Sequence, residues 1–236
     1  MFNERIKAWS YSRLVDFEQC KLRAKLKYID RIPEPARPLP PGKTEHANDR
    51  GTRIHDAAER FVRGGVELIP ELKAFEAEFH DLRNKYAHGM VSLEGEWAVN
   101  KDWEPVAWGD KDAWARIKLD AFVRLSKTHA VVIDYKTGKK FGNEIKHAEQ
   151  TQLYQLAAFL RYPELETIDV ELWYTDQDDL THMKYTRSQG MRFFQNFNQR
   201  GIAMTSAEEF PPSPNVFACK WCPYGPRGTG DCDKGV

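Results

Sequence analysis

Apolar and polar residues alternate regularly in the middle of the chain. From residue 114 to residue 125 every second residue is apolar, and charged residues occupy most of the positions between them. A period of two predicts a strand with one buried face. The segment 130–136 (AVVIDYK) is apolar until its last three residues, which predicts a second strand. Because only four residues separate the two segments, we expect a hairpin in which the strands pair antiparallel.

The remaining periodic segments predict further strands and helices. Further strands are expected over residues 93–100, 105–108, 168–175 and 181–186. Apolar residues at spacings of three and four predict helices over residues 12–28, 49–63, 70–87, 144–160 and 188–199. Elements in this order predict an α/β fold, with a mixed central β-sheet flanked by helices.

The chain divides into three parts. A proline-rich segment over residues 32–41 follows the first predicted helix, and prolines within residues 211–214 precede a polar tail with three cysteines. We therefore expect a helical N-terminal addition over residues 1–48, a core over residues 49–205 and a cysteine-rich C-terminal addition over residues 206–236. A chain of 236 residues with 41% hydrophobic residues fits one large domain, with or without a small appendage.

The end of the second hairpin strand combines an acid with a lysine. Asp134 and Lys136 are two residues apart, so on a strand they point to the same face. The expected hairpin register places Asp120 opposite Tyr135 and diagonal to Asp134 and Lys136, with Cβ atoms about 5–8 Å apart. Two carboxylates at this distance can share a divalent cation, and the ammonium can orient an attacking water. The alternative is a solvated strand face with an ordinary ion pair, and these residues alone do not distinguish the two.

Two predicted helices carry polar residues that suit the same chemistry. His55 lies at one edge of the apolar stripe of the helix over residues 49–63. A neutral imidazole there can ligate a metal, although a hydrogen-bonded core histidine is the more common case. Gln150 and Tyr154 are one turn apart on the helix over residues 144–160 and project together. Such a pair either packs at the surface or contacts a phosphate or the reacting water.

The order of these residues resembles the PD-(D/E)XK nuclease superfamily, and within it the RecB-like branch. The segment 10–20 (SYSRLVDFEQC) is similar to the opening helix of RecB-like nucleases with an iron–sulfur cluster, such as CRISPR-associated adaptation exonucleases and the AddB nuclease domain. The resemblance spans residues 10–232 and implies a restriction-endonuclease-like core. The residues that carry it are, in chain order, His55, Asp120, Asp134, Lys136, Gln150 and Tyr154.

The resemblance implies a site for a divalent cation, Mg²⁺ or Mn²⁺. Its ligands would be His55, Asp120 and Asp134, helped by the carbonyl of Tyr135. Oxygen ligands suit both cations, and a histidine in the set favours Mn²⁺.

The resemblance also implies the catalytic groups. Lys136 would be the catalytic lysine, and Gln150 with Tyr154 would complete the site. Many relatives place an acid on the first strand of the core, where Glu96 stands in this sequence and Glu94 is a rival.

Four cysteines form a second group, with Cys20 near the start of the chain and Cys219, Cys222 and Cys232 in the tail. Four thiolates suit a zinc ion or an iron–sulfur cluster, whereas disulfides are typical of secreted chains. The resemblance implies a structural 4Fe–4S cluster, with zinc as the alternative, because such nucleases pair one upstream cysteine with three at the C-terminus. The nine residues between Cys222 and Cys232 exceed the spacing expected for the family, and we expect this insert to loop out.

The overall charge is balanced, with 35 basic and 35 acidic residues. Many nucleic-acid-binding proteins are basic overall, so the balance counts mildly against one, although an acidic metal site makes some nucleases an exception. The candidate contacts to a nucleic-acid backbone are Arg13, Lys139 and Lys140, for which a solvated surface is the alternative. No apolar run approaches a membrane span and the N-terminus lacks a signal sequence, so we expect a cytoplasmic protein that binds no membrane.

The function expected from the residues and the resemblance together is metal-dependent hydrolysis of DNA. The resemblance implies exonuclease action on single-stranded DNA or DNA ends, in recombination, repair, phage DNA processing or CRISPR adaptation. A helicase, a recombinase or a CRISPR integrase is a possible protein partner, and an oligomer is possible. The alternatives are a catalytically silent or partner-dependent nucleic-acid-binding module, and a zinc-stabilised interaction protein.

Overall fold

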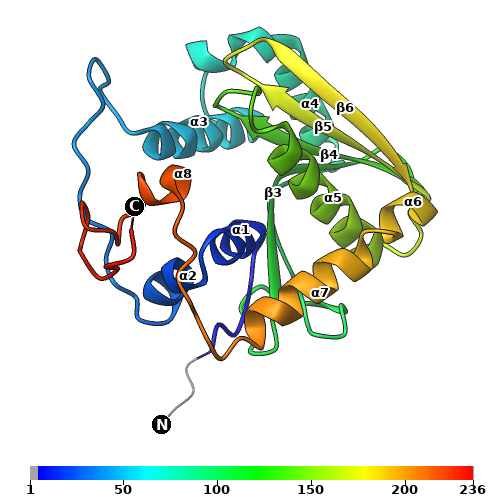
Figure 1. Ribbon diagram of the computed structural model, residues 1–236. Helices are drawn as coiled ribbons and strands as arrows, with labels where there is room; N and C mark the ends of the chain where they lie inside the picture. The colour runs from blue at the N-terminus through cyan, green and yellow to red at the C-terminus, as the bar shows by residue number, and fades with distance from the viewer. Residues whose placement is uncertain (1–4, 236) are drawn as a thin grey trace.

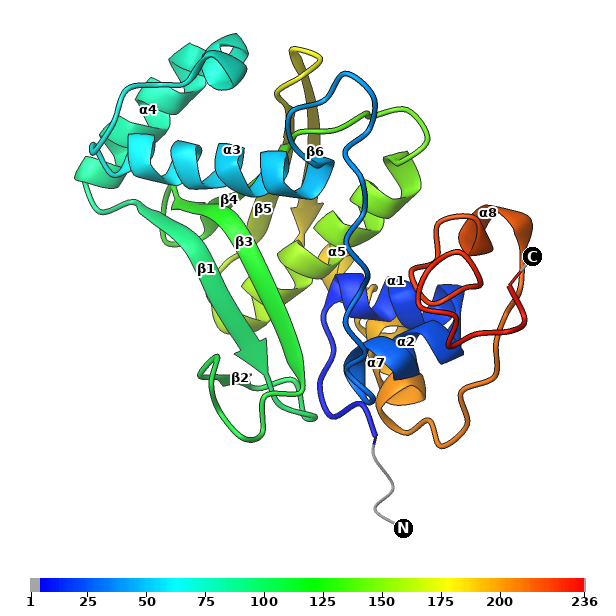
Figure 2. The same ribbon diagram turned by 90° about the vertical axis from the view of Figure 1, so that its left-hand side faces the viewer.

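The computed structural model describes residues 5–235, whose chain folds around one six-stranded sheet (Figures 1 and 2). The strands lie in the order β2-β1-β3-β4-β5-β6. Neighbouring strands pair antiparallel except β4 and β5, which are parallel, so the predicted mixed sheet is confirmed. The strands are β1 (Val91–Val99), β2 (Pro105–Val106), β3 (Ala115–Arg124), β4 (His129–Lys136), β5 (Thr167–Tyr174) and β6 (Asp179–Thr186).

Helices cover both faces of the sheet and enclose a separate apolar core on each. On one face α3, α4 and the 3₁₀ helix η1 pack against the strands, and on the other face α1, α5 and α7 do so (Figure 2). The predicted arrangement of flanking helices is therefore also confirmed. The helices are α1 (Tyr11–Gln19), α2 (Lys21–Tyr28), α3 (Ala47–Val62), η1 (Pro70–Phe75), α4 (Glu76–Ala87), α5 (Glu144–Arg161), α6 (Arg187–Met191), α7 (Phe194–Thr205) and α8 (Val216–Cys219).

The single N-terminal helix predicted from the sequence is in fact two helices. The break falls at Cys20, whose backbone is extended with φ −162° and ψ 112°. The apolar spacing continues through the break because Leu14 and Phe17 on α1 and Ala24 on α2 all pack in the same core. The pattern of apolar residues therefore could not reveal the break. Cys20 lies between the end of α1 and the start of α2.

The hairpin between β3 and β4 pairs one residue out of the predicted register. Arg124 rather than Leu125 pairs with Ala130, and Leu125 belongs to the loop with 37% of its surface exposed. The predicted pairing of Leu125 with Ala130 was therefore wrong, because apolar Leu125 extends the sequence pattern beyond the strand. Asp120 forms no pair in this ladder, and its side chain instead accepts the N–H of Tyr135 at 2.7 Å.

At Asp120 the apolar side chains of β3 change from one face of the sheet to the other. Residues two apart on a strand should share a face, yet Leu119 packs in the core beneath α5 whereas Ala121 packs in the core beneath α3. Strand β1 changes sides at the same level, where Glu94 has a left-handed φ of 49°. Neither acid takes part in the regular pairing of β1 with β3. The uninterrupted alternation predicted for β3 is therefore wrong at this point.

The proline-rich segment forms no helix or strand and crosses from α2 to α3 beside the C-terminal tail (Figure 2). Two hydrogen bonds join these segments, from the Tyr224 hydroxyl to the carbonyl of Ile32 at 3.1 Å and from Arg37 to the carbonyl of Trp221 at 3.2 Å. Tyr224 is fully buried. Among residues 5–235, no helix has the length and apolar character needed to cross a membrane.

Candidate functional site

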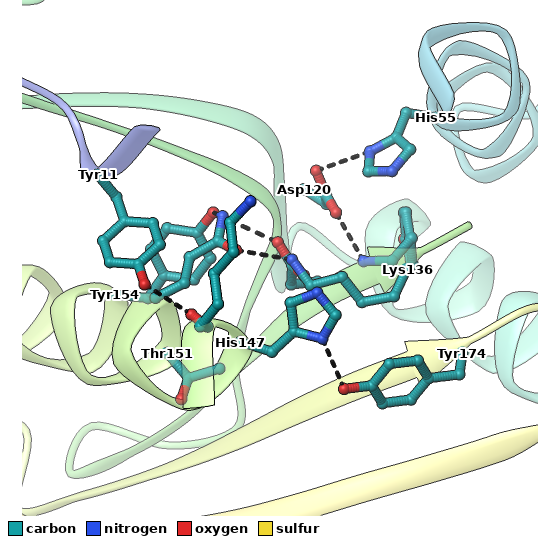
Figure 3. Close-up of polar contacts among 12 residues, drawn as sticks. Tyr11, His55, Asp120, Lys136, His147, Thr151, Tyr154 and Tyr174 are labelled. Atoms are coloured by element: carbon teal, nitrogen blue, oxygen red, sulfur yellow. Dashed lines mark hydrogen bonds and ion pairs between the residues drawn. The ribbon is translucent and has the colours of Figure 1, made fainter. Parts of the chain in front are cut away.

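A cavity of about 630 Å³ opens where the carboxyl end of β4 meets α3 and the start of α5. We call it the acidic cavity. Figure 3 shows side chains from these elements converging on it. The sequence-predicted residues that line it are His55, Asp120, Asp134, Tyr135, Lys136, Gln150 and Tyr154. The fold thus brings together residues that lie far apart along the chain.

Three ligand-type side chains meet on one side of the acidic cavity. His55, Glu94 and Asp120 each offer one atom, and these atoms lie within 4.8 Å of one another. His55 Nδ1 and Asp120 Oδ1 share a hydrogen bond of 3.0 Å. An imidazole and two carboxylates at this separation suit a divalent cation such as Mn²⁺ or Mg²⁺.

Local backbone geometry places these ligands. The N–H of Tyr135 donates to Asp120 Oδ2 at 2.7 Å, so the side chain takes the place of a strand hydrogen bond. Glu94 is held by Lys118, whose Nζ lies 2.6 Å from Oε2. His55 is held by α3, where its neighbour Ile54 is fully buried.

A second polar group surrounds Lys136. Its Nζ forms an ion pair with the buried carboxylate of Asp134 and donates to Gln150 Oε1 at 2.8 Å. Gln150 in turn donates to the hydroxyl of Tyr154, which donates to Asp134 Oδ1 at 3.3 Å. The four side chains form a closed network that fixes the direction of the ammonium.

The pKa shifts reflect this concentration of acids. Burial opposes a charge on His55, but the hydrogen bond and charge of Asp120, with the charges of Asp134 and Glu94, outweigh burial and raise its pKa to about 9. Burial also raises the pKa of Asp134, against the opposing charge of Lys136. Burial raises the pKa of Glu94, partly offset by its bond to Lys118. The site therefore attracts positive charge, which a proton or a metal ion can supply.

The acid on the first core strand is at a different place from the one predicted. Glu94 lines the acidic cavity, whereas Glu96 is exposed and does not. Glu96 pairs with Lys118 across β1 and β3 and so lies two residues further along the strands from Asp120 than Glu94 does. The left-handed backbone at Glu94, which a regular alternation could not predict, explains the difference.

Sequence reasoning missed two residues near the site. His147 lines the acidic cavity, and its Nδ1 shares a hydrogen bond of 2.9 Å with the hydroxyl of Tyr174 (Figure 3). Arg50 on α3 donates to the carbonyl of Thr137 at 3.0 Å and forms a two-pronged ion pair with Asp176, which fixes the loop after β4. A histidine one turn before Gln150 was a signal that could have been read from the sequence.

The three predicted nucleic-acid contacts fall in different surroundings. Lys139 is exposed in the loop after β4. Lys140 is partly buried and is paired with Asp179, its Nζ 2.6 Å from the carboxylate. Arg13 lies away from the acidic cavity and lines a different one.

The four cysteines line one pocket, formed by Cys20 between α1 and α2 and by Cys219, Cys222 and Cys232 of the tail. All four are free thiols and partly buried. The insert after Cys222 loops out and is closed by the N–H of Cys232, which donates to the carbonyl of Tyr224 at 2.8 Å. The long spacing in the sequence thus does not separate Cys232 from the other three.

Four thiolates around one pocket suit either a zinc ion or an iron–sulfur cluster.

An acidic metal site beside a buried, oriented lysine at the end of a sheet is typical of enzymes that hydrolyse phosphate esters. Residues 8–227 match the PD-(D/E)XK nuclease superfamily. The chain therefore belongs to this superfamily of nucleases, as its motifs predicted. The RecB-like branch and the iron–sulfur cluster stay predictions.

Solved structures with a similar course of the chain share 14% sequence identity with it. The structure titled SSO0001 aligns over 98% of this chain and 87% of that chain, with a TM-score of 0.48. An alkaline exonuclease from Laribacter hongkongensis, LHK-Exo, aligns over 88% of this chain and 92% of that chain, with TM-scores of 0.33 alone and 0.32 in complex with dAMP. No curated protein matches the chain.

Proposed function

We propose that this protein is a divalent-metal-dependent exonuclease that acts on single-stranded DNA or DNA ends. The observation that carries the proposal is the convergence of His55, Glu94 and Asp120 beside the Asp134–Lys136 pair in one open cavity. Membership of a nuclease superfamily supports a phosphodiester as the substrate.

The residues divide into those that would hold the cation and those that would act on the substrate. His55, Asp120 and Asp134, with the carbonyl of Tyr135, are the proposed ligands, and Glu94 takes the place predicted for Glu96. When bound, Mg²⁺ or Mn²⁺ would polarise the scissile phosphate and lower the pKa of the attacking water.

Lys136 is the proposed catalytic lysine. Its ammonium is oriented by Asp134 and Gln150, so it can donate to the attacking water or to a phosphate oxygen without first reorganising. Tyr154 holds Gln150 and Asp134 in place and is 5% exposed, so its role is to position the network.

The cysteine pocket supports a 4Fe–4S cluster, bound by Cys20, Cys219, Cys222 and Cys232. The resemblance in the motifs favours the cluster over zinc, because such nucleases pair one upstream cysteine with three at the C-terminus. Such a centre would join the break between α1 and α2 to the C-terminal tail, so its role would be structural. On this proposal the chain consists of a cluster-bearing N-terminal part over residues 1–48, a nuclease core over residues 49–205 and a closing tail over residues 206–236.

The finer biological assignment rests on the resemblance in the motifs. It favours recombination, repair, phage DNA processing or CRISPR adaptation, with a helicase, a recombinase or an integrase as the protein partner. Exposed Lys139 is the proposed backbone contact next to the acidic cavity.

The test is cleavage of end-labelled single-stranded DNA by protein purified without oxygen, in the presence of Mn²⁺. We expect the wild type to release mononucleotides or short oligonucleotides and Lys136→Ala to release none, because no other ammonium occupies this network. Lys127→Ala, which removes an exposed lysine from the β3–β4 loop, is the matched control and should cleave normally. Normal cleavage by Lys136→Ala would exclude the role of the lysine. A folded wild-type protein that binds DNA without cutting it would exclude the nuclease.

A further inference from the structure

A second cavity, of about 670 Å³, lies away from the acidic cavity and is lined by basic residues. We call it the basic cavity. Its cations come from the N-terminal segment, from α1, from the loop after α2 and from the start of β3, and they are Arg5, Lys7, Arg13, Arg31 and Arg116. We propose that the basic cavity binds the phosphodiester backbone of the same nucleic-acid strand whose scissile bond lies in the acidic cavity. The proposal rests on the proposed function.

Four of the five cations have no carboxylate partner in the described part of the chain. Within residues 5–235, no carboxylate lies within 4.0 Å of the charged groups of Lys7, Arg13, Arg31 and Arg116. Arg5 is the exception and pairs with Glu208. One acid, Asp30, lines the basic cavity, and it is paired with Lys25. The basic cavity therefore has a net positive charge although the whole chain is balanced.

Two of these guanidinium groups are fixed by neutral partners. Arg13 donates to the carbonyl of Ala8 at 3.3 Å and lies over the ring of Tyr28, 4.9 Å from its centre. Arg116 donates to the carbonyl of Trp108 at 3.1 Å and lies over the Trp108 ring, 5.8 Å from its centre. Carbonyls and rings orient the groups but leave their charge available for an anion.

Arg31 occupies its place at a conformational cost. Its φ is 54°, in the left-handed region that glycine and asparagine adopt more readily. The fold offsets this cost with a backbone hydrogen bond across the turn, from the N–H of Ile32 to the carbonyl of Leu26 at 2.9 Å. The exposed side chain has no carboxylate partner among residues 5–235, so its charge is available to an anion in the basic cavity.

Strand β3 connects the two cavities. Arg116, Lys118 and Asp120 are successive alternate residues, of which Arg116 lines the basic cavity and the other two line the acidic cavity. At about 3.3 Å per residue, Arg116 and Asp120 are about 13 Å apart along the strand. Figure 2 shows β3 starting beside the N-terminal segment and running towards α3. The Trp9–Ala115 bridge fixes that start.

This arrangement fits an extended polyanion better than a single phosphate. The cations come from four separate segments and leave a wide opening rather than closing around one group. A strand anchored at the acidic cavity would carry its next phosphates along β3 into reach of these cations. Single-stranded nucleic acid is recognised in this way, by a positive groove that follows the backbone.

The experiment measures binding of single-stranded DNA as a function of salt, with Ca²⁺ in place of Mn²⁺. The variant is Lys7→Gln/Arg13→Gln/Arg31→Gln. The plot of log affinity against log salt has a negative slope, and each lost phosphate contact makes it shallower by about 0.7. Loss of three contacts should therefore reduce the magnitude of the slope by about 2 and the affinity at 0.1 M salt by about a hundredfold. A dinucleotide, too short to reach the basic cavity, should bind the variant and the wild type equally.

Two further variants distinguish a loss of phosphate contacts from a loss of folding. Arg31→Gly removes a charge but relieves the backbone, so it should raise the melting temperature while lowering the affinity for a strand of about 12 nucleotides. Arg60→Gln, an exposed arginine on α3 outside both cavities, is the matched control and should change neither slope nor affinity.

The outcomes separate the proposal from the proposed function. An unchanged slope in the triple variant, or an equal loss for the dinucleotide and the long strand, would overturn the proposal for the basic cavity while the wild type still cleaves DNA. A loss of slope in folded variants of a wild type that never cleaves DNA would support the basic cavity and overturn the nuclease. Competition by free nucleotide at the same concentration of phosphate as the strand would also overturn the proposal for the basic cavity, because a single anion would then suffice.

Discussion

The acidic cavity and the cysteine pocket are both candidate sites for inorganic groups, but the fold supports them in different ways. The ligands of the acidic cavity project from α3, β1, β3 and β4, whose apolar residues fill the two cores beneath the helices. The cysteines lie at a helix break and in a tail of loops, where the short helix α8 has no buried residue. Apart from Tyr224, few side chains of the tail are buried.

This difference indicates, for each site, whether the fold depends on the bound group or the binding site depends on the fold. The acidic cavity is shaped by packing that does not involve a metal, so it should persist when the cation is removed. The tail has little apolar burial of its own, so its position should depend on the group that the thiols bind. In the first case the fold positions the site, and in the second the site positions part of the fold.

The largest expected effect is on the cysteine side of this comparison. Cys219→Ala removes one of the four proposed ligands, and we expect a loss of several kcal/mol of stability because binding of a structural metal contributes about 10 kcal/mol or more. Visible absorption and iron content should fall together with the melting temperature. Ser213→Ala, which changes an exposed residue lining the same pocket, is the control. Full absorption and stability in Cys219→Ala would exclude the cluster.

The acidic cavity should respond in the opposite way. Asp120→Asn keeps the shape of the side chain but removes its charge, so cleavage should fall about 10²–10³-fold while the melting temperature without metal changes little. Mn²⁺ titration should show weaker binding. A matching loss of visible absorption would show that the two sites are not independent and would contradict the comparison.

A smaller effect separates the two glutamates on β1. Glu94→Gln should weaken Mn²⁺ binding about tenfold, since Glu94 lies with His55 and Asp120, whereas Glu96→Gln should leave it unchanged. Each variant is the control for the other, and Mn²⁺ titration is the measurement. A larger effect of Glu96→Gln would contradict the placement of Glu94 in the metal site.

The smallest effect concerns His147. Burial, with the charges of Lys136 and Lys146, lowers its pKa from 6.5 to about 4. Between pH 6.5 and pH 4 the unfolded chain takes up a proton that the folded protein does not, so His147 reduces stability as the pH falls through this window. Since the residue is partly exposed, we expect an effect on the order of 1 kcal/mol.

The variant His147→Asn should lack this part of the pH dependence. Denaturant unfolding at pH 7 and pH 4.5 is the measurement, and the variant should lose less stability than the wild type between the two. His88→Asn, an exposed histidine at the end of α4, is the control. Equal losses in wild type and His147→Asn would contradict the lowered pKa.

The elements of the core were predictable because their burial follows simple periods. Strands β3 and β4, the helix with His55 and the helix with Gln150 all have apolar residues at regular spacing, and the structure has them within a few residues of the expected positions. The motif order then identified the superfamily. The break at Cys20 and the division of the last long helix into α6 and α7 were missed, because apolar spacing continues on both sides of each break.

The finer geometry of the site depends on departures from regularity. Glu94 reaches His55 because β1 has a left-handed residue there, and Asp120 bonds the N–H of Tyr135 because β3 turns over. Neither irregularity changes the pattern of apolar residues enough to be predicted. Arg31 is a similar case, since the sequence gives no sign of its left-handed backbone.

The most direct test of the proposed nuclease site is release of nucleotides from end-labelled single-stranded DNA by iron-loaded protein, with Mn²⁺ and with EDTA. We expect release with Mn²⁺ and none with EDTA, while the visible absorption stays the same in both. Release that continues in EDTA, or no release with Mn²⁺ from folded and fully loaded protein, would contradict the claim that the acidic cavity is a metal-dependent nuclease site.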